Sequence, residues 1–467
     1  IHTLTGHREQ VAHMAFSLDG RVLASTALDH TARLWDTRSG QEIARIVHPD
    51  RPFERIHFTQ DGVIAAGRDQ AAYYWRLQAI LPRADLRAHE NAVQSVAYNP
   101  DGTKLVSAAA DFNVNIWDTA TGQLERPLGE PQTHRWSVNG ARFDPTGQRI
   151  LSFSEDDFAV LWDSESGEML WYIHADGPMR DGVFSPDGAY VAVAAADSTI
   201  GVLFADTGEV KFQSEIHEGG ALGVAFSPDG RELMSRGADG KIRFWDVETG
   251  TERLKIDAHG LSVTTASYSP DGRWLVSGAG GGGDGIAMVF DVATGETVAR
   301  LYPHNEVVRQ AIFTADGKRV LTAAGDGFAR LWDIETEAIV TSVSSDQRDL
   351  SDVAISPDGQ RFVTVAFQSD GPSAVLWDIE SGQRLADYFG QSSTVLDVEF
   401  APTLPGEPMQ FATASYQGAV EIWTAPLPSN SEDLVEMACG ILRPLNRTIS
   451  RQEALQYGLD WPVEASC

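Results

Sequence analysis

Histidine and aspartate are the residues of this chain with the most scope for chemistry, and they recur together at regular intervals. A lone His–Asp pair would predict acid–base or nucleophilic chemistry, because the carboxylate orients the imidazole that moves the proton. Here the pair occurs eight times, which indicates a repeated structural unit instead. The histidines are eight of the chain's twelve, namely His7, His48, His89, His134, His174, His217, His259 and His304, and the aspartates are Asp29, Asp69, Asp111, Asp156, Asp197, Asp239, Asp284 and Asp326.

A bulky apolar residue, usually Trp followed by Asp, stands six residues after each of these aspartates and sets the period. The spacing is 40 to 46 residues over ten copies, at Trp35, Trp75, Trp117, Trp162, Leu203, Trp245, Phe290, Trp332, Trp377 and Trp423. A turn of the type Ser-Pro-Asp-Gly travels with it, intact at 185–188, 227–230, 269–272 and 356–359. Such a turn between alternating apolar runs predicts a β-hairpin in each repeat.

This combination of period, Trp-Asp dipeptide and hairpin turn resembles the WD40 (WD-repeat) family and is similar to the WD-repeat regions of bacterial multidomain signalling proteins. The resemblance implies an all-β propeller of four-stranded antiparallel blades. We predict ten blades over residues 1–427. The segment 1–5 looks like an outer strand without inner strands before it, so we expect it to pair with the last blade and close one ring. Two smaller propellers, or a shorter ring with stray blades, are the alternatives.

The same resemblance assigns the recurring residues to a buried hydrogen-bond network inside each blade rather than to catalysis. Repeats nine and ten lack both the His and the Asp, so we expect their blades to be less rigid. The clearest networks are expected at His7, Asp29 and Trp35; His89, Asp111 and Trp117; His217, Asp239 and Trp245; and His304, Asp326 and Trp332.

The repeat pattern stops near residue 428, and residues 428–467 are predicted to form a short helical tail. Ser450 and Glu453 have the spacing of a capping box at the start of a helix. Cys439 and Cys467 are the only cysteines. They either pair as a disulfide or stay reduced, as a cytosol would keep them, and the sequence leaves both alternatives open.

Composition narrows the range of partners. The chain has 66 Asp and Glu against 36 Lys and Arg, a net charge of −30, which repels nucleic-acid phosphates and favours a protein or peptide of basic character. No apolar run is long enough to cross a membrane, and no targeting segment is evident at the start, so we expect a cytoplasmic protein without membrane insertion. The chain does not begin with Met, and an effector domain is expected in an upstream segment.

No residue pattern predicts a catalytic group, a cofactor or a metal site. The glycine-rich run 278–285 lacks the Lys and the helix of a phosphate-binding loop and is predicted to be a surface loop. We therefore expect a non-catalytic interaction scaffold or sensor module, with a small-molecule-binding or hydrolytic propeller with its site in the central channel as the alternative. The predicted partner-binding residues are three aromatics on neighbouring repeats, Phe53, Phe112 and Trp136.

Overall fold

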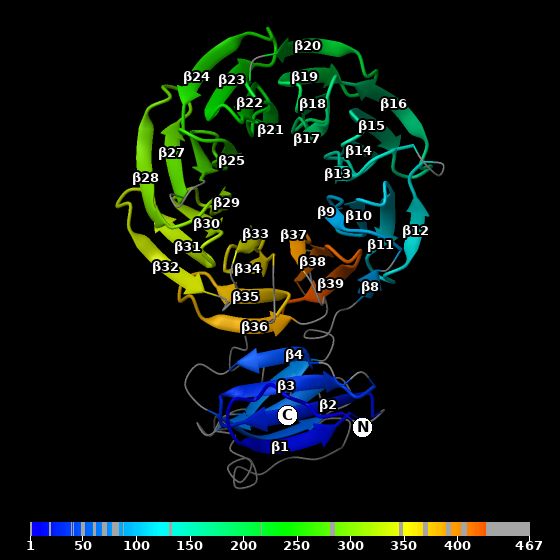
Figure 1. Ribbon diagram of the computed structural model, residues 1–467, viewed down its shortest axis with the longest axis vertical. Coiled ribbons are helices and arrows are strands. Elements are labelled where there is room, and N and C mark those ends of the chain that lie inside the picture. Colours follow the sequence, from blue (N-terminus) through cyan, green and yellow to red (C-terminus); the bar gives the residue numbers. More distant parts are fainter. Residues whose placement is uncertain are drawn as a thin grey trace, which may run out of the picture.

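In the computed structural model the chain folds into a closed ring of antiparallel blades with a second, smaller β-unit attached to its outside (Figure 1). The structure describes residues 2–425 except 18–19, 39, 41, 48–51, 59–61, 68–71, 77–83, 87, 130–132, 216, 281–284, 345–348, 368–371, 389–393 and 403–408. All elements assigned among these residues are strands. The predicted helical tail, with Cys439 and Cys467, lies outside the described residues.

The ring begins with five blades that follow one another along the chain. Each has four strands, the first lining the channel and the fourth on the outside. Their strands are β9 (Val93–Tyr98), β10 (Lys104–Ala109), β11 (Val114–Asp118) and β12 (Leu124–Pro127); β13 (Val138–Phe143), β14 (Arg149–Ser154), β15 (Phe158–Asp163) and β16 (Met169–His174); β17 (Met179–Phe184), β18 (Tyr190–Ala195), β19 (Thr199–Phe204) and β20 (Val210–Glu215); β21 (Ala221–Phe226), β22 (Glu232–Gly237), β23 (Lys241–Asp246) and β24 (Glu252–Asp257); and β25 (Val263–Tyr268), β26 (Trp274–Ala279), β27 (Gly285–Asp291) and β28 (Thr297–His304).

Three further blades complete the circle, and the last of them borrows its outer strand. They are β29 (Val308–Phe313), β30 (Arg319–Ala324), β31 (Phe328–Asp333) and β32 (Ile339–Ser344); β33 (Leu350–Ile355), β34 (Arg361–Ala366), β35 (Ala374–Asp378) and β36 (Arg384–Tyr388); and β37 (Val395–Phe400), β38 (Gln410–Ser415) and β39 (Val420–Thr424) with β8 (Ala84–Leu86). Seven separate four-stranded sheets and the β33–β36 half of an eight-stranded sheet thus make a ring of eight. The inner strands pack in sequence from β9 to β37 and back to β9.

The first two repeats lie outside the ring and form what we call the N-terminal pair. One sheet holds β1 (Val11–Phe16), β2 (Val22–Ala27), β3 (Thr31–Asp36) and β4 (Glu42–Val47), and the other holds β5 (Phe53–Phe58), β6 (Gly62–Gly67) and β7 (Ala72–Arg76). The two sheets stack through a small core that includes Leu34, Phe53 and Ile56. The β4 edge continues the sheet of the ring by pairing with β36, where Ala44 faces Tyr388.

The predicted all-β propeller is confirmed, but the single ring of ten blades is wrong. The shorter ring with stray blades, one of the alternatives, describes the structure. Closure by residues 1–5 is also wrong, because β39 pairs with β8, with Ile422 opposite Ala84 and Val420 opposite Leu86. His2 instead lies beside Gly40 of its own sheet. The physical reason for closure stands, since β8 covers an edge of the last blade that would otherwise template aggregation.

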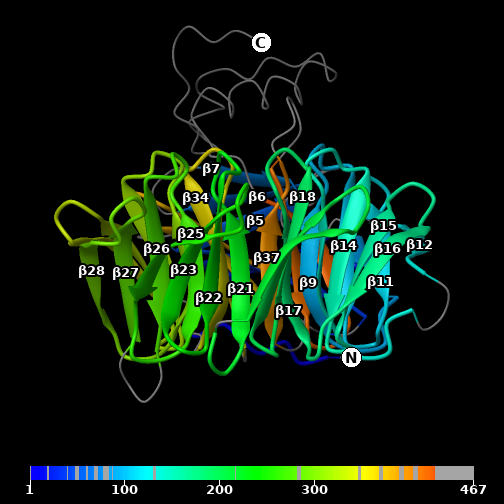
Figure 2. The ribbon, with the colours of Figure 1, turned by 90° about the horizontal axis from the view of Figure 1, so that it is seen from above.

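Each sheet is apolar on both faces, so the hydrophobic core is divided into separate clusters at the junctions between neighbouring blades. One such cluster joins Leu151 and Phe153 of one blade to Met179, Val191 and Leu203 of the next. Seen from the side, the strands stand along the height of the ring, so each junction is a deep sheet-on-sheet contact (Figure 2). This packing fixes the loops at the two rims of the ring.

Candidate functional site

The recurring histidines are held in a relay of hydrogen bonds that runs across each blade. In the β21–β24 blade, the Nδ1–H of His217 donates to Asp239 over 3.0 Å, and the Ser235 hydroxyl lies 2.9 Å from His217 Nε2. The Trp245 indole N–H donates to the same hydroxyl over 3.0 Å. These groups are buried and satisfy one another, which is how a blade keeps polar side chains in its interior.

The same relay is built in four other blades, with Nδ1-to-carboxylate distances between 3.0 and 3.4 Å. Its members are His7, Ser25, Asp29 and Trp35; His89, Ser107, Asp111 and Trp117; His134, Ser152, Asp156 and Trp162; and His304, Thr322, Asp326 and Trp332. The relay in the first of these lies in the N-terminal pair, so it does not depend on membership of the ring.

In the β21–β24 and β29–β32 blades, the surroundings favour an ionised aspartate and a neutral histidine, because the pKa of each of these groups is lowered. Burial by itself would raise the pKa of Asp326, but hydrogen bonds from His304 and Arg330 and their charges outweigh it and lower that pKa to about 2. Burial lowers the pKa of His304 and of His217, in spite of their carboxylate partners. A proton acceptor that is enclosed and already hydrogen-bonded has no access to substrate, so the relay stabilises the blade.

Two of the periodic histidines depart from this arrangement. His174 ends β16, where its ring lies 4.9 Å from that of Phe158 in its own blade. Asp197 of the next blade instead accepts the backbone N–H of Asp176. His259 keeps the Ser277 hydroxyl at 2.7 Å, but its buried Nδ1 has no hydrogen-bond partner among the residues that the structure describes. In the five complete relays, the His and the Asp are 22 residues apart in sequence; here the intervals are 23 and 25.

The last two blades keep part of the relay. The Trp377 indole N–H donates to Thr364 over 2.9 Å, and that of Trp423 donates to Thr413 over 3.0 Å. Trp423 is fully buried beside Phe411 and Tyr388. The missing His and Asp of these two repeats are therefore offset by apolar packing around the tryptophans.

One rim of the ring is formed by the histidine loops and by the turns between the second and third strands of each blade. The turn of one blade lies against the histidine loop of the next: a Cβ added to Gly240 would lie 2.8 Å from the carbonyl oxygen of Leu261, and one added to Gly418 would lie 3.0 Å from that of Asn91. Phe112 and Trp136 occupy the corresponding positions, so these two side chains belong to one junction.

Phe112 has a positive-φ turn conformation that recurs at the same position of other repeats, in His30, Asp157 and Ser198. Its φ is +74°, close to the values of Gly240 and Gly418, which stand at the same position in other blades. Positive φ costs a residue with a Cβ about 1–2 kcal/mol and is rare for bulky side chains. A large aromatic thus takes a position where glycine is favoured by the backbone; the conformation itself belongs to the repeated turn, since three other repeats also place a non-glycine residue there.

Aromatic side chains stand exposed along this rim on three successive blades. Phe112 is 43% exposed, Trp136 63% and Tyr416 61%. Tyr416 lies in the turn between β38 and β39, two residues before Gly418. We call these three residues the aromatic arc. Phe53, predicted for this patch, is 1% exposed in the core of the N-terminal pair, so that prediction is wrong. Tyr416 was missed, although its place in the turn is readable from the repeat.

The channel wall carries carboxyl groups that tie neighbouring blades together. Asp397 accepts the backbone N–H of Val96, and Glu399 accepts that of Tyr98, both on the next inner strand. Burial raises the pKa of Glu399 to about 8. Burial and the neighbouring Asp397 carboxylate raise the pKa of Asp352, which hydrogen-bonds with Asp397. These carboxyl groups serve the packing of strands, and no set of three potential metal ligands gathers among the described residues.

Comparisons with known proteins agree with this geometry. Residues 1–36, 81–118, 125–163, 210–246, 250–291 and 295–333 match the family described as WD domain, G-beta repeat. A stretch of 124 residues is 27% identical to ribosome assembly protein 4 of Saccharomyces cerevisiae, covering 26% of this chain and 24% of that protein. Serine-threonine kinase receptor-associated protein of Gallus gallus is also 27% identical over 124 residues, which cover 26% of this chain and 35% of that protein. The matched stretch thus spans 24% and 35% of these relatives' length.

A solved structure extends the likeness to most of the ring. The crystal structure of the computationally designed Ika8 protein superposes with a TM-score of 0.64 at 26% sequence identity, covering 73% of this chain and 99% of that protein. In the part of the chain that the structure describes, no helix is long and apolar enough to span a bilayer.

Proposed function

We propose that this chain of WD repeats, folded as a propeller, is a non-catalytic interaction scaffold that binds a protein or peptide partner of basic character at the aromatic arc. The observation that carries the proposal is the run of Tyr416, Phe112 and Trp136 on three successive blades, exposed on a rigid rim. Large aromatics on a fixed backbone give contact area at small entropic cost, which makes them the usual anchors of an interface.

Charge sets the expected character of the partner. The chain carries a net charge of −30, with 66 Asp and Glu against 36 Lys and Arg. An acidic surface accelerates encounter with a positively charged partner and rejects acidic ones. The names of two relatives refer to ribosome assembly and to receptor association, which supports a scaffold role for repeats of this kind.

Several finer features of the proposal rest on the sequence alone. They are the likeness to the WD-repeat regions of bacterial multidomain signalling proteins, the effector domain upstream, and the cytoplasmic location. The aromatic arc does not depend on any of them, because it is defined by residues of the ring.

The test is selection of peptides from a random display library on the immobilised full chain, followed by affinity measurement on variants. We expect basic peptides, with affinity lowered at least tenfold by Trp136→Ala and by Phe112→Gly. Tyr172→Ala is the matched control, because Tyr172 is similarly exposed but lies on the outer strand β16 of the same blade as Trp136. Selection of acidic peptides, or an equal loss in the control, would overturn the proposal.

A further inference from the structure

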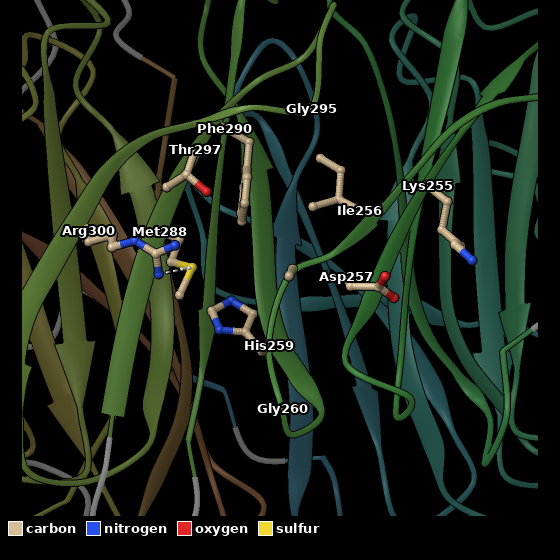
Figure 3. Close-up of a pocket in the computed structure, with 11 residues that line it drawn as sticks. Lys255, Ile256, Asp257, His259, Gly260, Met288, Phe290, Gly295, Thr297 and Arg300 are labelled. Atoms are coloured by element: carbon tan, nitrogen blue, oxygen red, sulfur yellow. Dashed lines mark hydrogen bonds between the residues drawn. The ribbon is translucent and has the colours of Figure 1, made fainter.

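A cavity opens on the outside of the ring between two neighbouring blades, away from the aromatic arc. It has a volume of about 560 Å³ and lies between β24 of one blade and β27 and β28 of the next. Figure 3 shows Arg300, Met288 and Thr297 on one side, Ile256 and Asp257 on the other, and His259 below them. A space of this size and shape accommodates a small molecule.

The cavity coincides with one of the blades whose relay is incomplete, and two substitutions and a lengthened loop distinguish this blade. Phe290 replaces the tryptophan of other blades, so Ser277 receives no indole N–H. Met288 stands where Arg243 and Arg330 stand in two other blades. The interval from histidine to aspartate is lengthened to 25 residues by the glycine run, and the aspartate itself, Asp284, lies outside the described residues.

Two polar groups at this cavity, the His259 imidazole and the Arg300 guanidinium, have no carboxylate partner among the described residues. Within the described ranges, the buried Nδ1 of His259 has no hydrogen-bond partner, which is unfavourable for a polar atom removed from water. Among the described residues, the Arg300 guanidinium contacts the Met288 sulfur at 3.7 Å and no carboxylate. Arg300 is also the one charged group that acts on His259, whose pKa falls to about 4 through burial and that charge. The imidazole is therefore neutral at neutral pH.

The complete relays show what such a pair of groups binds. In the β29–β32 blade, one oxygen of Asp326 lies 3.4 Å from His304 Nδ1 and 2.9 Å from the Arg330 guanidinium. In the β21–β24 blade, Asp239 bridges His217 and Arg243 in the same way at 3.0 and 3.1 Å. A histidine and a third-strand arginine thus form a carboxylate site in those blades; the His259 blade keeps the histidine and has its arginine on the fourth strand instead, where Arg300 of β28 lies opposite Met288.

We propose that the cavity between β24 and β28 binds a small carboxylate, which is held by the Arg300 guanidinium and by His259 Nδ1–H. Ile256, Met288 and Phe290 border the cavity but are at most 9% exposed, so the affinity is expected to depend on the carboxylate. Met288 has to rotate for the carboxylate to reach the imidazole, which its unbranched side chain permits. The proton stays on Nδ1 while Nε2 accepts the Ser277 hydroxyl, the tautomer of the complete relays.

The test is calorimetric titration of the full chain with hexanoate, and with hexanamide as the uncharged match. We expect saturable binding of hexanoate and none of hexanamide, with affinity at least tenfold lower in Arg300→Gln. The matched control is Arg273→Gln, because Arg273 is an exposed arginine of the same blade that stacks on Trp274 outside the cavity. Nitrogen-15 NMR of labelled histidine reports on Nδ1 directly and should show one imidazole shifting on addition of hexanoate.

Three results would overturn the proposal. If hexanoate does not bind, the cavity is not a carboxylate site. If hexanoate binds the Arg300→Gln variant as well as the wild type, it binds elsewhere on the protein. Binding seen only in Asp284→Asn means that the chain's own aspartate completes the relay, so that no ligand is needed. The His259→Gln variant separates the contribution of the imidazole from that of the Arg300 charge. It is expected to fold normally and to bind hexanoate more weakly. An unchanged affinity would exclude His259 from the site.

Discussion

The ring and the N-terminal pair are built from the same repeat yet differ in what covers their inner strands. Val11 of β1 is 42% exposed, whereas Val308 at the same place in β29 is fully buried against the preceding blade. The relay of His7, Asp29 and Trp35 is nevertheless as complete as those of the ring. A blade therefore forms from its own sequence, and its burial depends on neighbours.

The difference also shows how the ring closes. The last blade has three strands of its own and takes β8 as its fourth, while the β5–β7 sheet, next to β8 in the chain, is left with three. The segment β8 can serve as the outer strand of only one of these two sheets. The winning pairing fixes the ring at eight blades and places the first two repeats outside it.

The largest expected effect concerns the closing strand. Leu86 is buried among Trp117, Val420 and Ile422, so Leu86→Ala should destabilise the ring by about 3 kcal/mol. The matched change in the N-terminal pair, Val11→Ala, should cost less than about 0.5 kcal/mol because this side chain is already exposed. Urea denaturation followed by tryptophan fluorescence measures both. Equal losses would mean that β8 is not part of the ring's core.

A smaller effect should separate complete from incomplete relays. His217→Ala removes hydrogen bonds to both Asp239 and Ser235 and should cost about 2 kcal/mol, whereas His259→Ala removes only the bond to Ser277 and should cost about 1 kcal/mol. The comparison is made by thermal unfolding at one pH. A larger loss for His259→Ala would show that its Nδ1 has a partner after all.

The channel wall of the ring should give a pH dependence that the N-terminal pair lacks. The pKa of Glu399 is raised by burial to about 8 from an ordinary value of 4.5, so the folded state holds a proton that the unfolded state releases. Stability from this group is full below pH 4.5, falls by about 1.4 kcal/mol per pH unit as the pH rises towards 8, and is level above that. Asp397 and Arg142 act on the same carboxyl in opposite directions.

The measurement is the difference in unfolding free energy between the wild type and Glu399→Gln at several pH values, which cancels the other titrating groups. The Gln variant should gain on the wild type steadily between pH 4.5 and 8. A difference that does not change with pH would show that Glu399 is ionised in the folded ring.

The smallest expected effect has the opposite sign. Phe112→Gly relieves positive φ but adds chain entropy to the unfolded state, with a net stabilisation of about 0.5 kcal/mol. The same variant should bind peptide more weakly, so its stability would rise while its affinity for the partner falls. Gly240→Ala at the equivalent place of another blade should destabilise, because its Cβ would collide with the carbonyl oxygen of His259. A Phe112→Gly variant less stable than the wild type would contradict the account of strain.

Local features of the fold were predictable from the sequence because they depend on contacts within one repeat. The hairpins follow from the Ser-Pro-Asp-Gly turns, and the spacing of 22 residues between His and Asp marks each complete relay. The spacing of 25 after His259 was a readable signal of a broken one. Phe53 and Phe112 differ in exposure because of their places in the repeat: Phe53 begins an inner strand, as the buried Val93 does, whereas Phe112 lies in the turn between the second and third strands.

The closing strand was not predictable in the same way. The tripeptide at 84–86 has no property that distinguishes one sheet edge from another, because antiparallel pairing is made by the backbone. The choice between the edges of β7 and β39 is a competition over more than three hundred residues of chain, decided by the curvature of the stacked blades. Ring size is therefore a property of the assembled sheets.

The most direct test of the closure uses disulfide formation between the two strands that close the ring. In a background with Cys439→Ser and Cys467→Ser, the pair Asp85→Cys and Glu421→Cys should cross-link on mild oxidation, because these residues face each other in the β8–β39 ladder. Thr3→Cys with Glu421→Cys should remain reduced. Cross-linking of residue 3 in place of residue 85 would contradict the ring of eight and restore closure by the start of the chain.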